Sequence, residues 1–173
     1  DFKLLAIKVD NWNDDLSPWA APPVFGDRGF IGGAEKTLDE ILKICDESDK
    51  TYYIGGYSLA GLFCLWAAYK TDIFNGVAAA SPSVWFPGFD EFIKANDIHV
   101  SKVCLSLGDK EEKTRNPVMS TVGQRIRDAH SLYTSKGIEC TLDFNPGNHF
   151  KDTEIRTAKV FARLIDNSKN RTL

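Results

Sequence analysis

Two hydrophobic periods alternate along the chain, one typical of buried strands and one typical of amphipathic helices. Five short runs have the apolar content of strands that a sheet buries on both faces. They are residues 2–9, 51–55, 77–80, 103–107 and 139–144. Two longer stretches, residues 11–33 and 108–117, fit neither period, and long irregular loops in a compact domain usually have a function.

Four other stretches have the period of helices. Residues 58–69 are apolar nearly all round, as in a helix buried against a sheet. The other three show apolar stripes: Leu38, Ile41, Leu42 and Cys45; Val122, Ile126, Ala129 and Tyr133; Ile155, Ala158, Phe161, Ala162 and Ile165. Strands that alternate with helices predict an α/β fold with a mainly parallel sheet and helices on both faces.

The composition is that of an ordinary globular protein. The chain has 173 residues, 43% of them hydrophobic and 26% charged, which suits one domain with a sizeable core. A net charge of −3 without a Lys/Arg cluster argues against nucleic acid or an anionic membrane as the main partner. No apolar run approaches the roughly 20 residues of a membrane span.

The cysteines Cys45, Cys64, Cys104 and Cys140 stand singly in apolar surroundings. Because none forms a C-x-x-C pair, neither a disulfide framework nor a zinc site is expected. We interpret them as small buried hydrophobes in a reducing compartment, which predicts a cytoplasmic location.

The stretch around Ser58 has the pattern of a nucleophile elbow, a sharp turn from a strand into a helix. Such a turn needs small residues two positions before and two after the serine, and Gly56 and Ala60 occupy them. The turn would raise the Ser58 hydroxyl above the sheet and aim the Leu59 N–H at a developing oxyanion. The alternative is a serine that only caps the helix.

A serine nucleophile needs a general base, and the chain has three histidines. His149 lies in a turn-rich loop after the last strand-like run, at the carboxyl edge of the sheet where ligands gather in open parallel sheets. We expect His149 to be the base, although a structural histidine is the alternative. His99 precedes a strand and His130 borders a helix, so solvated or packing roles are expected for both.

The third member of a catalytic triad is a carboxylate that orients the histidine. The run 103–107 delivers Asp109, Glu111 and Glu112 to the same edge of the sheet. The acid commonly lies three residues after a glycine in this turn, and counting from Gly108 selects Glu111. Asp109 remains the alternative, and Glu112 is expected to be solvated.

These features resemble the α/β-hydrolase superfamily, and within it the esterase branch of siderophore esterases, feruloyl esterases and esterase D-like enzymes. The resemblance covers nearly the whole chain. Its motifs are Asp15-Leu16-Ser17-Pro18, Gly56-Tyr57-Ser58-Leu59-Ala60-Gly61, Ser81-Pro82-Ser83-Val84-Trp85, Gly108-x-x-Glu111 and Gly147-Asn148-His149-Phe150. Trp12-Asn13-Asp14 stand where siderophore esterases tend to have an arginine, which argues against a large anionic catecholate substrate.

The family sheet has eight strands, whereas the chain has five strand-like runs. The resemblance implies that residues 1–173 form a single α/β-hydrolase domain whose N-terminal strands, and the loop with the second oxyanion donor, lie upstream of Asp1. The Leu59 N–H is then the oxyanion donor within this chain. An unpaired first strand at residues 2–9 would be covered by roughly 40 or more upstream residues or by a partner chain.

The expected activity is cleavage of a carboxylic ester by Ser58, His149 and Glu111 through an acyl-enzyme. No metal or organic cofactor is implied, and the expected partner is a small-molecule ester, bound by a monomer or homodimer. The short segment between residues 80 and 103 leaves little room for a lid domain. An open cleft would be rimmed by aromatic side chains that otherwise only pack: Trp12, Trp19, Trp85 and Phe86.

Three alternatives to an esterase follow from the same pattern. A thioesterase or an acyltransferase would use the same triad, and the sequence does not separate them from an esterase. A non-catalytic hydrolase-fold binding module is disfavoured because nucleophile, base and acid are all present in order. A flavodoxin-like nucleotide-binding domain would need a Gly-rich phosphate loop after its first strand, and Val9-Asp10-Asn11-Trp12 has none.

Overall fold

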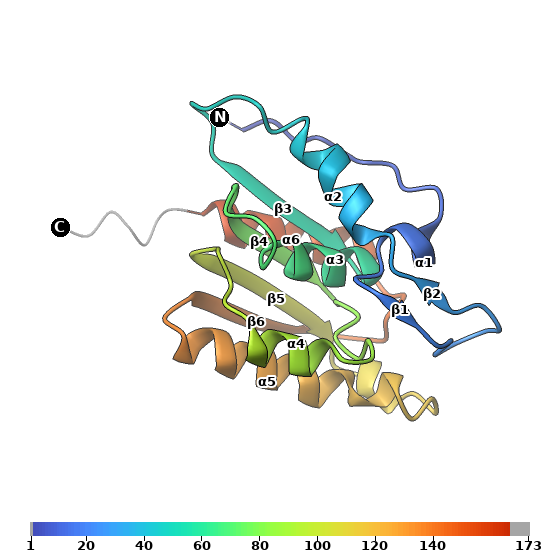
Figure 1. Ribbon diagram of the computed structural model, residues 1–173. Coiled ribbons are helices and arrows are strands. Elements are labelled where there is room, and N and C mark those ends of the chain that lie inside the picture. The colour runs from blue at the N-terminus through green and yellow to red at the C-terminus, as the bar shows by residue number, and fades with distance from the viewer. Residues whose placement is uncertain (1, 167–173) are drawn as a thin grey trace.

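A four-stranded parallel sheet forms the centre of the computed structural model, which describes residues 2–166 (Figure 1). Its strands are β3 (Tyr52–Tyr57), β4 (Phe74–Ala80), β5 (Lys102–Gly108) and β6 (Glu139–Asn145). They are hydrogen-bonded in the order β3-β4-β5-β6, and each neighbouring pair is parallel. Four of the five predicted runs are therefore strands, and the predicted α/β class is confirmed.

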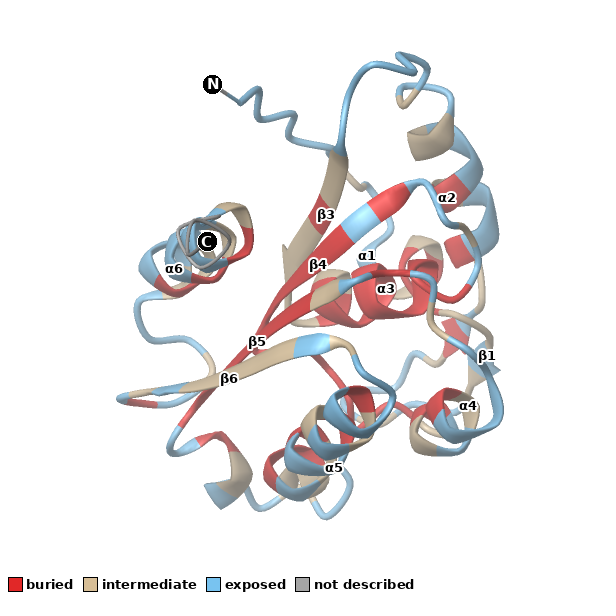
Figure 2. Ribbon diagram, turned by 90° about the vertical axis from the view of Figure 1, so that its left-hand side faces the viewer, coloured by how far each residue is buried: buried red, intermediate tan, exposed pale blue. Residues whose placement is uncertain are grey.

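Helices cover both faces of this sheet (Figure 2). On one face, α3 (Leu59–Ala67) packs against β3 and β4, and α5 (Val122–Ser135) packs against β5 and β6 with the short helix α4 (Phe89–Ala95) beside it. The other face is covered by α6 (Thr153–Ile165). Most of the core lies under α3, α4 and α5, and a smaller apolar cluster lies between the sheet and α6.

This topology gathers four loops at one edge of the sheet. Parallel strands end at the same edge, so the residues that follow β3, β4, β5 and β6 meet there. The segment between β4 and β5 contains α4 as its helix, and the described residues include no large lid over this edge.

Residues 11–33, predicted as irregular, contain small elements of their own. α1 (Trp12–Asp15) is a single turn, and β1 (Ala20–Ala21) pairs antiparallel with β2 (Phe30–Ile31) in a short hairpin. The hairpin leads into α2 (Ala34–Leu42). The second irregular stretch, residues 108–117, contains the 3₁₀ turn η1 (Glu111–Lys113), and a second 3₁₀ turn, η2 (Met119–Thr121), follows it.

The prediction of a first strand at residues 2–9 is wrong. The segment has no strand pairing, and Phe2 and Leu4 are 74% and 71% exposed. An apolar run becomes a strand only where a neighbour supplies hydrogen bonds to its backbone. β3 is the edge of the sheet within residues 2–166, and it pairs with β4 rather than with this segment.

The apolar stripe predicted for α6 is mostly wrong in phase, although its member Phe161 packs against the smaller apolar cluster. Ile155 and Ala158 are exposed, whereas the buried positions are Arg156, Val160 and Leu164. These three are spaced four residues apart, as the inner face of a helix requires. The pattern misassigned this face because an arginine occupies its first position, and a charged side chain is buried only where it is paired.

None of the helices within residues 2–166 is long and apolar enough to cross a bilayer.

The four cysteines are free; Cys64 and Cys104 are buried, and Cys45 and Cys140 are half-buried. Burial raises the pKa of the Cys140 thiol to about 12, so this thiol stays protonated at neutral pH.

Candidate active site

Ser58 lies at the tip of a strained turn between β3 and α3. Its φ of 57° and ψ of −121° are values that residues with a side chain rarely adopt, which is typical of functional turns. A Cβ on Gly56 would lie 2.7 Å from the Cβ of Ala60, so this position requires glycine. Among the described residues the Ser58 side chain caps no amide of α3, which argues against a mere helix cap.

His149 approaches Ser58 from the loop between β6 and α6. Its Nε2 lies 2.9 Å from the Ser58 hydroxyl oxygen. The Tyr57 hydroxyl donates a 2.6 Å hydrogen bond to the backbone carbonyl of His149, and the two rings pack with centroids 5.3 Å apart. The residue before the serine therefore holds the histidine loop over the turn.

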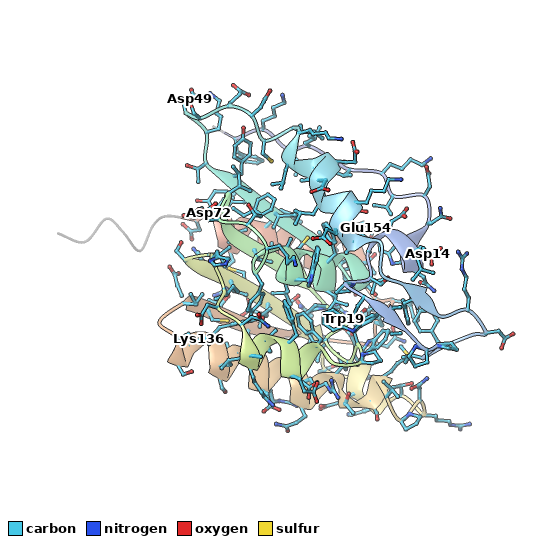
Figure 3. All side chains as sticks on the ribbon, in the orientation of Figure 1. Asp14, Trp19, Asp49, Asp72, Lys136 and Glu154 are labelled. Atoms are coloured by element: carbon cyan, nitrogen blue, oxygen red, sulfur yellow. The ribbon has the colours of Figure 1, made fainter. Side chains whose placement is uncertain are left out.

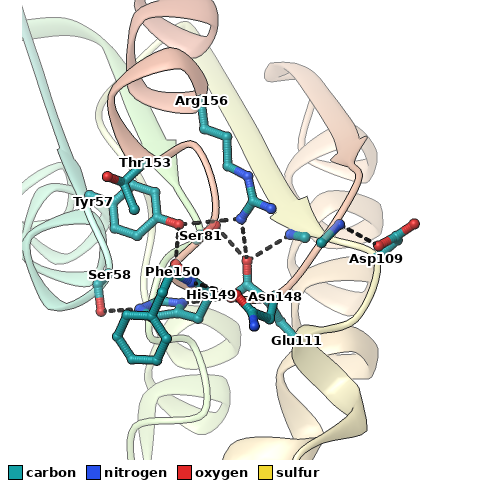
Figure 4. Close-up of polar contacts among 12 residues, drawn as sticks. Tyr57, Ser58, Ser81, Asp109, Glu111, Asn148, His149, Phe150, Thr153 and Arg156 are labelled. Carbon is teal, nitrogen blue, oxygen red and sulfur yellow. Dashed lines mark hydrogen bonds and ion pairs between the residues drawn. The ribbon is translucent and has the colours of Figure 1, made fainter.

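Glu111 completes the arrangement from η1, directly after β5. Its Oε2 lies 2.7 Å from His149 Nδ1 (Figure 4). The other oxygen, Oε1, accepts hydrogen bonds from the Ser81 hydroxyl at 2.7 Å, the Gly108 amide at 2.7 Å and the Arg156 guanidinium at 3.1 Å. The members of this group come from strand ends, loops, η1 and the first turn of α6, which meet at the same edge of the sheet.

The charge state of Glu111 follows from these contacts. Burial alone would raise its pKa, but hydrogen bonds from His149 and Ser81 outweigh burial and hold the pKa below its ordinary value. Glu111 is therefore ionised at neutral pH and can only accept hydrogen bonds. The proton shared with it resides on His149 Nδ1, which leaves Nε2 free to accept the proton of Ser58.

The other two carboxylates of this turn have different contacts. Asp109 Oδ1 accepts a 2.7 Å hydrogen bond from the Gly147 amide, so it shapes the histidine loop through the backbone. Glu112 forms an ion pair with Arg127 of α5 on the surface, as expected for a solvated residue. Of the three acids, Glu111 is the one that the structure brings to His149.

The remaining histidines lie apart from this group. His99 is exposed and precedes β5, at the opposite end of the strand from Glu111. His130 is half-buried on α5. Within residues 2–166, no group of three or more His, Cys, Asp or Glu side chains could hold a metal ion.

Three of the four aromatic residues expected at a substrate cleft are packing residues. Trp85 and Phe86 are buried, and both rings pack against Phe30 of the hairpin. Trp19 lies between the hairpin and α4, where its indole N–H donates a 2.9 Å hydrogen bond to the Pro87 carbonyl (Figure 3). Trp12, at the start of α1, is half exposed.

Neither a protein-family model nor a curated protein sequence matches this chain. Among solved structures, an IroE-like serine hydrolase from Shewanella oneidensis matches with a TM-score of 0.70 and 20% identity, over 90% of this chain and 57% of that one. The siderophore hydrolase EstA from Aspergillus nidulans matches with a TM-score of 0.63 and 21% identity, over 88% of this chain and 65% of that one.

This chain has the α/β-hydrolase fold. The resemblance expected from the motifs is thereby confirmed at the level of the fold. A match with lower identity is the capsule O-acetyltransferase of Neisseria meningitidis serogroup A, with a TM-score of 0.55 and 13% identity. That match covers 76% of this chain and 65% of the acetyltransferase, so the chain spans less than two thirds of each of these three proteins.

Sequence reasoning missed several residues that this hydrolase-fold site brings together. Ser81 and Ser83 belong to a motif noted above, but no role followed from it. Ser81, with a φ of 44°, binds Glu111, and the Ser83 hydroxyl lies 3.4 Å from that of Ser58. Arg156 gave no usable signal, because the apolar stripe in the sequence of α6 places Ile155 and Ala158, rather than Arg156, on the inner face of the helix.

Proposed function

We propose that the chain is a serine hydrolase that cleaves a carboxylic ester through an acyl-enzyme. One observation supports this most strongly: two consecutive hydrogen bonds link Ser58 to His149 at 2.9 Å and His149 to Glu111 at 2.7 Å. A nucleophile, a base and an orienting acid in this sequence of contacts are the elements of acyl transfer.

The proposed reaction has two stages. Ser58 Oγ attacks the ester carbonyl while His149 Nε2 takes its proton, and the imidazolium then gives that proton to the departing alcohol. Water, deprotonated by His149, attacks the acyl-enzyme and releases the acid. Glu111 keeps the proton of the imidazole on Nδ1 and stabilises the imidazolium through both half-reactions.

The backbone at the start of α3 is the proposed binding site of the oxyanion that develops on the ester carbonyl. The first amides of a helix have no carbonyl partner within the helix, and the helix dipole favours negative charge at this end. Leu59 N–H, directly after the nucleophile, is the donor that we propose. The strained backbone of Ser58 fixes the relation between this amide and the hydroxyl, so the donor is in position before substrate binds.

The proposed substrate is a small or medium uncharged ester that binds from solvent. Two structural neighbours are a serine hydrolase and a siderophore hydrolase by name, but Trp12-Asn13-Asp14 replace the arginine expected for a large anionic catecholate. We propose two of the exposed aromatic side chains for contact with the substrate. Trp12 is one, and Phe150 is the other, with 84% of its surface exposed and its ring 5.3 Å from that of His149.

Acyl transfer to an acceptor other than water is the second candidate, supported by the similarity to a capsule O-acetyltransferase. A panel of p-nitrophenyl esters and matched thioesters, with and without added alcohol acceptors, tests both candidates. An esterase should release acid at a rate independent of the acceptor, and Ser58→Ala should abolish release. Product ester in place of acid would favour transfer, and turnover that survives in Ser58→Ala would overturn both.

A further inference from the structure

Arg156 is the most deeply buried charged side chain of the described residues. It belongs to the first turn of α6, and only 1% of its surface is exposed. The next inward positions of the helix, Val160 and Leu164, pack in the apolar cluster beneath the sheet. A guanidinium at such a position loses its hydration and must be compensated by the groups that it contacts.

The contacts of Arg156 join three parts of the site (Figure 4). Nη1 donates to Glu111 Oε1 at 3.1 Å and to the Tyr57 hydroxyl at 3.3 Å, and Nη2 donates to the Pro146 carbonyl at 3.1 Å. The Tyr57 hydroxyl in turn donates to the His149 carbonyl. One guanidinium thus contacts both the acid and the histidine loop directly, and it is linked to that loop a second time through Tyr57.

The surrounding backbone is shaped to admit this contact. A Cβ on Gly108 would lie 2.8 Å from Glu111 Oε1 and 2.9 Å from Arg156 Nη1, so a side chain there would separate the pair. Arginine also suits the geometry better than lysine does. Its planar fork reaches the carboxylate, the phenol and the carbonyl at once, whereas an ammonium is a single point charge.

We propose that Arg156 is a positioning residue that holds Glu111 and the His149 loop in register with Ser58 and sets the proton affinity of the imidazole. The proposal rests on the proposed function of Ser58, His149 and Glu111. Arg156 has no exposed surface to offer a substrate, so its effect must pass through these neighbours. Its loss should therefore lower kcat and leave KM nearly unchanged.

Arg156 also acts through its charge. Two titratable groups contact the His149 ring, Glu111 of η1 and Tyr57 of β3. Asp109 and Lys151 lie against Gly147 of the histidine loop, and Arg156 of α6 binds Glu111. The positive charge of Arg156 opposes a second positive charge on the imidazole and offsets part of the charge of Glu111. Without it, the imidazolium should persist to higher pH.

The test compares Arg156→Met and Arg156→Lys with Arg163→Met, a control on the same helix whose arginine pairs with Asp143 at the surface. Ester hydrolysis is measured across pH, and the ring signals of the three histidines are titrated by NMR, with His149→Gln used to assign the signal of His149. We expect Arg156→Met to lower kcat about 10–100-fold with KM within about twofold. The titration midpoint of His149 and the acidic limb of the rate profile should both move up by roughly half a unit to one unit.

Arg156→Lys separates charge from geometry, because it should keep the titration midpoint of the wild-type protein and recover only part of kcat. An unchanged kcat and midpoint in Arg156→Met, or an equal effect of Arg163→Met, would overturn the proposal. If Arg156→Met does not fold, Arg156→Gln removes the same charge with a polar side chain, and the same changes in kcat and midpoint are expected of it. The NMR titration does not depend on turnover. If the wild-type protein hydrolysed no ester, the proposed function would be contradicted, and the titration of His149 would still decide the role of Arg156.

Discussion

His149 Nδ1 lies 2.7 Å from Glu111 Oε2, although Asp109 is nearer to the end of the strand that delivers both acids. The 3₁₀ turn η1 accounts for this choice, because it turns the chain back so that the third residue after Gly108 faces the histidine loop. Asp109 instead binds the backbone of that loop at Gly147. The two acids therefore predict different consequences when each is neutralised.

Glu111→Gln should lower ester turnover by roughly 10²–10⁴-fold, because an amide no longer fixes the imidazole tautomer or stabilises the imidazolium. Asp109→Asn should cost less than about tenfold, since an asparagine Oδ1 can still accept from the Gly147 amide. Steady-state rates of the two variants on one p-nitrophenyl ester give the ranking. The reverse ranking would move the role of the acid to Asp109.

The lowered pKa of Glu111 predicts a specific pH dependence of stability. The unfolded chain takes up the proton near the ordinary value of 4.5, whereas the folded chain holds Glu111 ionised to lower pH. Its stabilisation is therefore complete above about pH 4.5 and is lost as the pH falls through the folded value. The difference in free energy of unfolding between wild type and Glu111→Gln should shrink as the pH falls below 4.5.

Urea unfolding at pH 7, 5, 4 and 3.5 checks this slope. Glu154→Gln, which removes an exposed carboxylate from the first turn of α6, is the matched control and should show a constant difference across this range. A wild-type advantage over Glu111→Gln that grows on acidification would contradict the assigned direction.

The steric requirement at the elbow gives a third prediction. In Gly56→Ala, the added Cβ would lie 2.7 Å from both the carbonyl carbon and the Cβ of Ala60, so the turn must open. We expect turnover to fall by at least about 10²-fold, because Ser58 and the Leu59 amide would lose their alignment. Circular dichroism and a kinetic assay separate misalignment from unfolding.

Gly137→Asn is the control for this change. Gly137 has a φ of 80° with open space around its Cβ position, and asparagine tolerates that backbone conformation. Its turnover should match that of the wild type. An equal loss in both glycine variants would show that general backbone strain, rather than the elbow, limits activity.

The exposed apolar segment at residues 2–7 predicts self-association. Phe2, Leu4 and Leu5 are exposed, and β3 is one of the two edges of the sheet within the described residues. Exposed apolar side chains and an unpaired strand edge both favour association between chains. The double variant Leu4→Gln, Leu5→Gln should sediment as a smaller species than the wild type at equal concentration, with its free energy of unfolding changed by less than about 0.5 kcal/mol.

The control for that experiment is Ile155→Gln, which removes an exposed apolar side chain from α6 at a distance from residues 2–7 in the sequence. It should leave the sedimentation of the wild type unchanged. If the double variant and the wild type sedimented identically, residues 2–7 would not be a cause of self-association.

The sequence predicted the parts of the fold that depend on local pattern and on chain order. Four apolar runs became the sheet, and the elbow could be recognised because a turn of that sharpness restricts Gly56 and Ala60 sterically. The sequence also predicted that Ser58, His149 and Glu111 would lie together, because each comes within a few residues after a strand whose carboxyl end lies at the common edge.

Features that depend on distant partners could not be predicted in this way. The segment at residues 2–9 has the composition of a strand but no neighbour to pair with in the described chain. Arg156 interrupts the apolar pattern on the inner face of α6. Its burial is possible because Glu111, 45 residues earlier in the chain, compensates its charge, and the sequence does not reveal that contact. The sequence also did not show whether Trp85 and Phe86 contact substrate or pack in the core, since only the position of the hairpin shows that they are buried.

Labelling with a fluorophosphonate probe tests the central claim most directly, because the probe forms a stable adduct only with an activated serine. The intact chain is incubated with the probe, digested and mapped by mass spectrometry, with His149→Gln as the comparison. The proposed triad predicts one adduct, on Ser58, which forms far more slowly in His149→Gln because the base is lost. An adduct on another serine, or equal labelling of Ser58 without His149, would contradict the account.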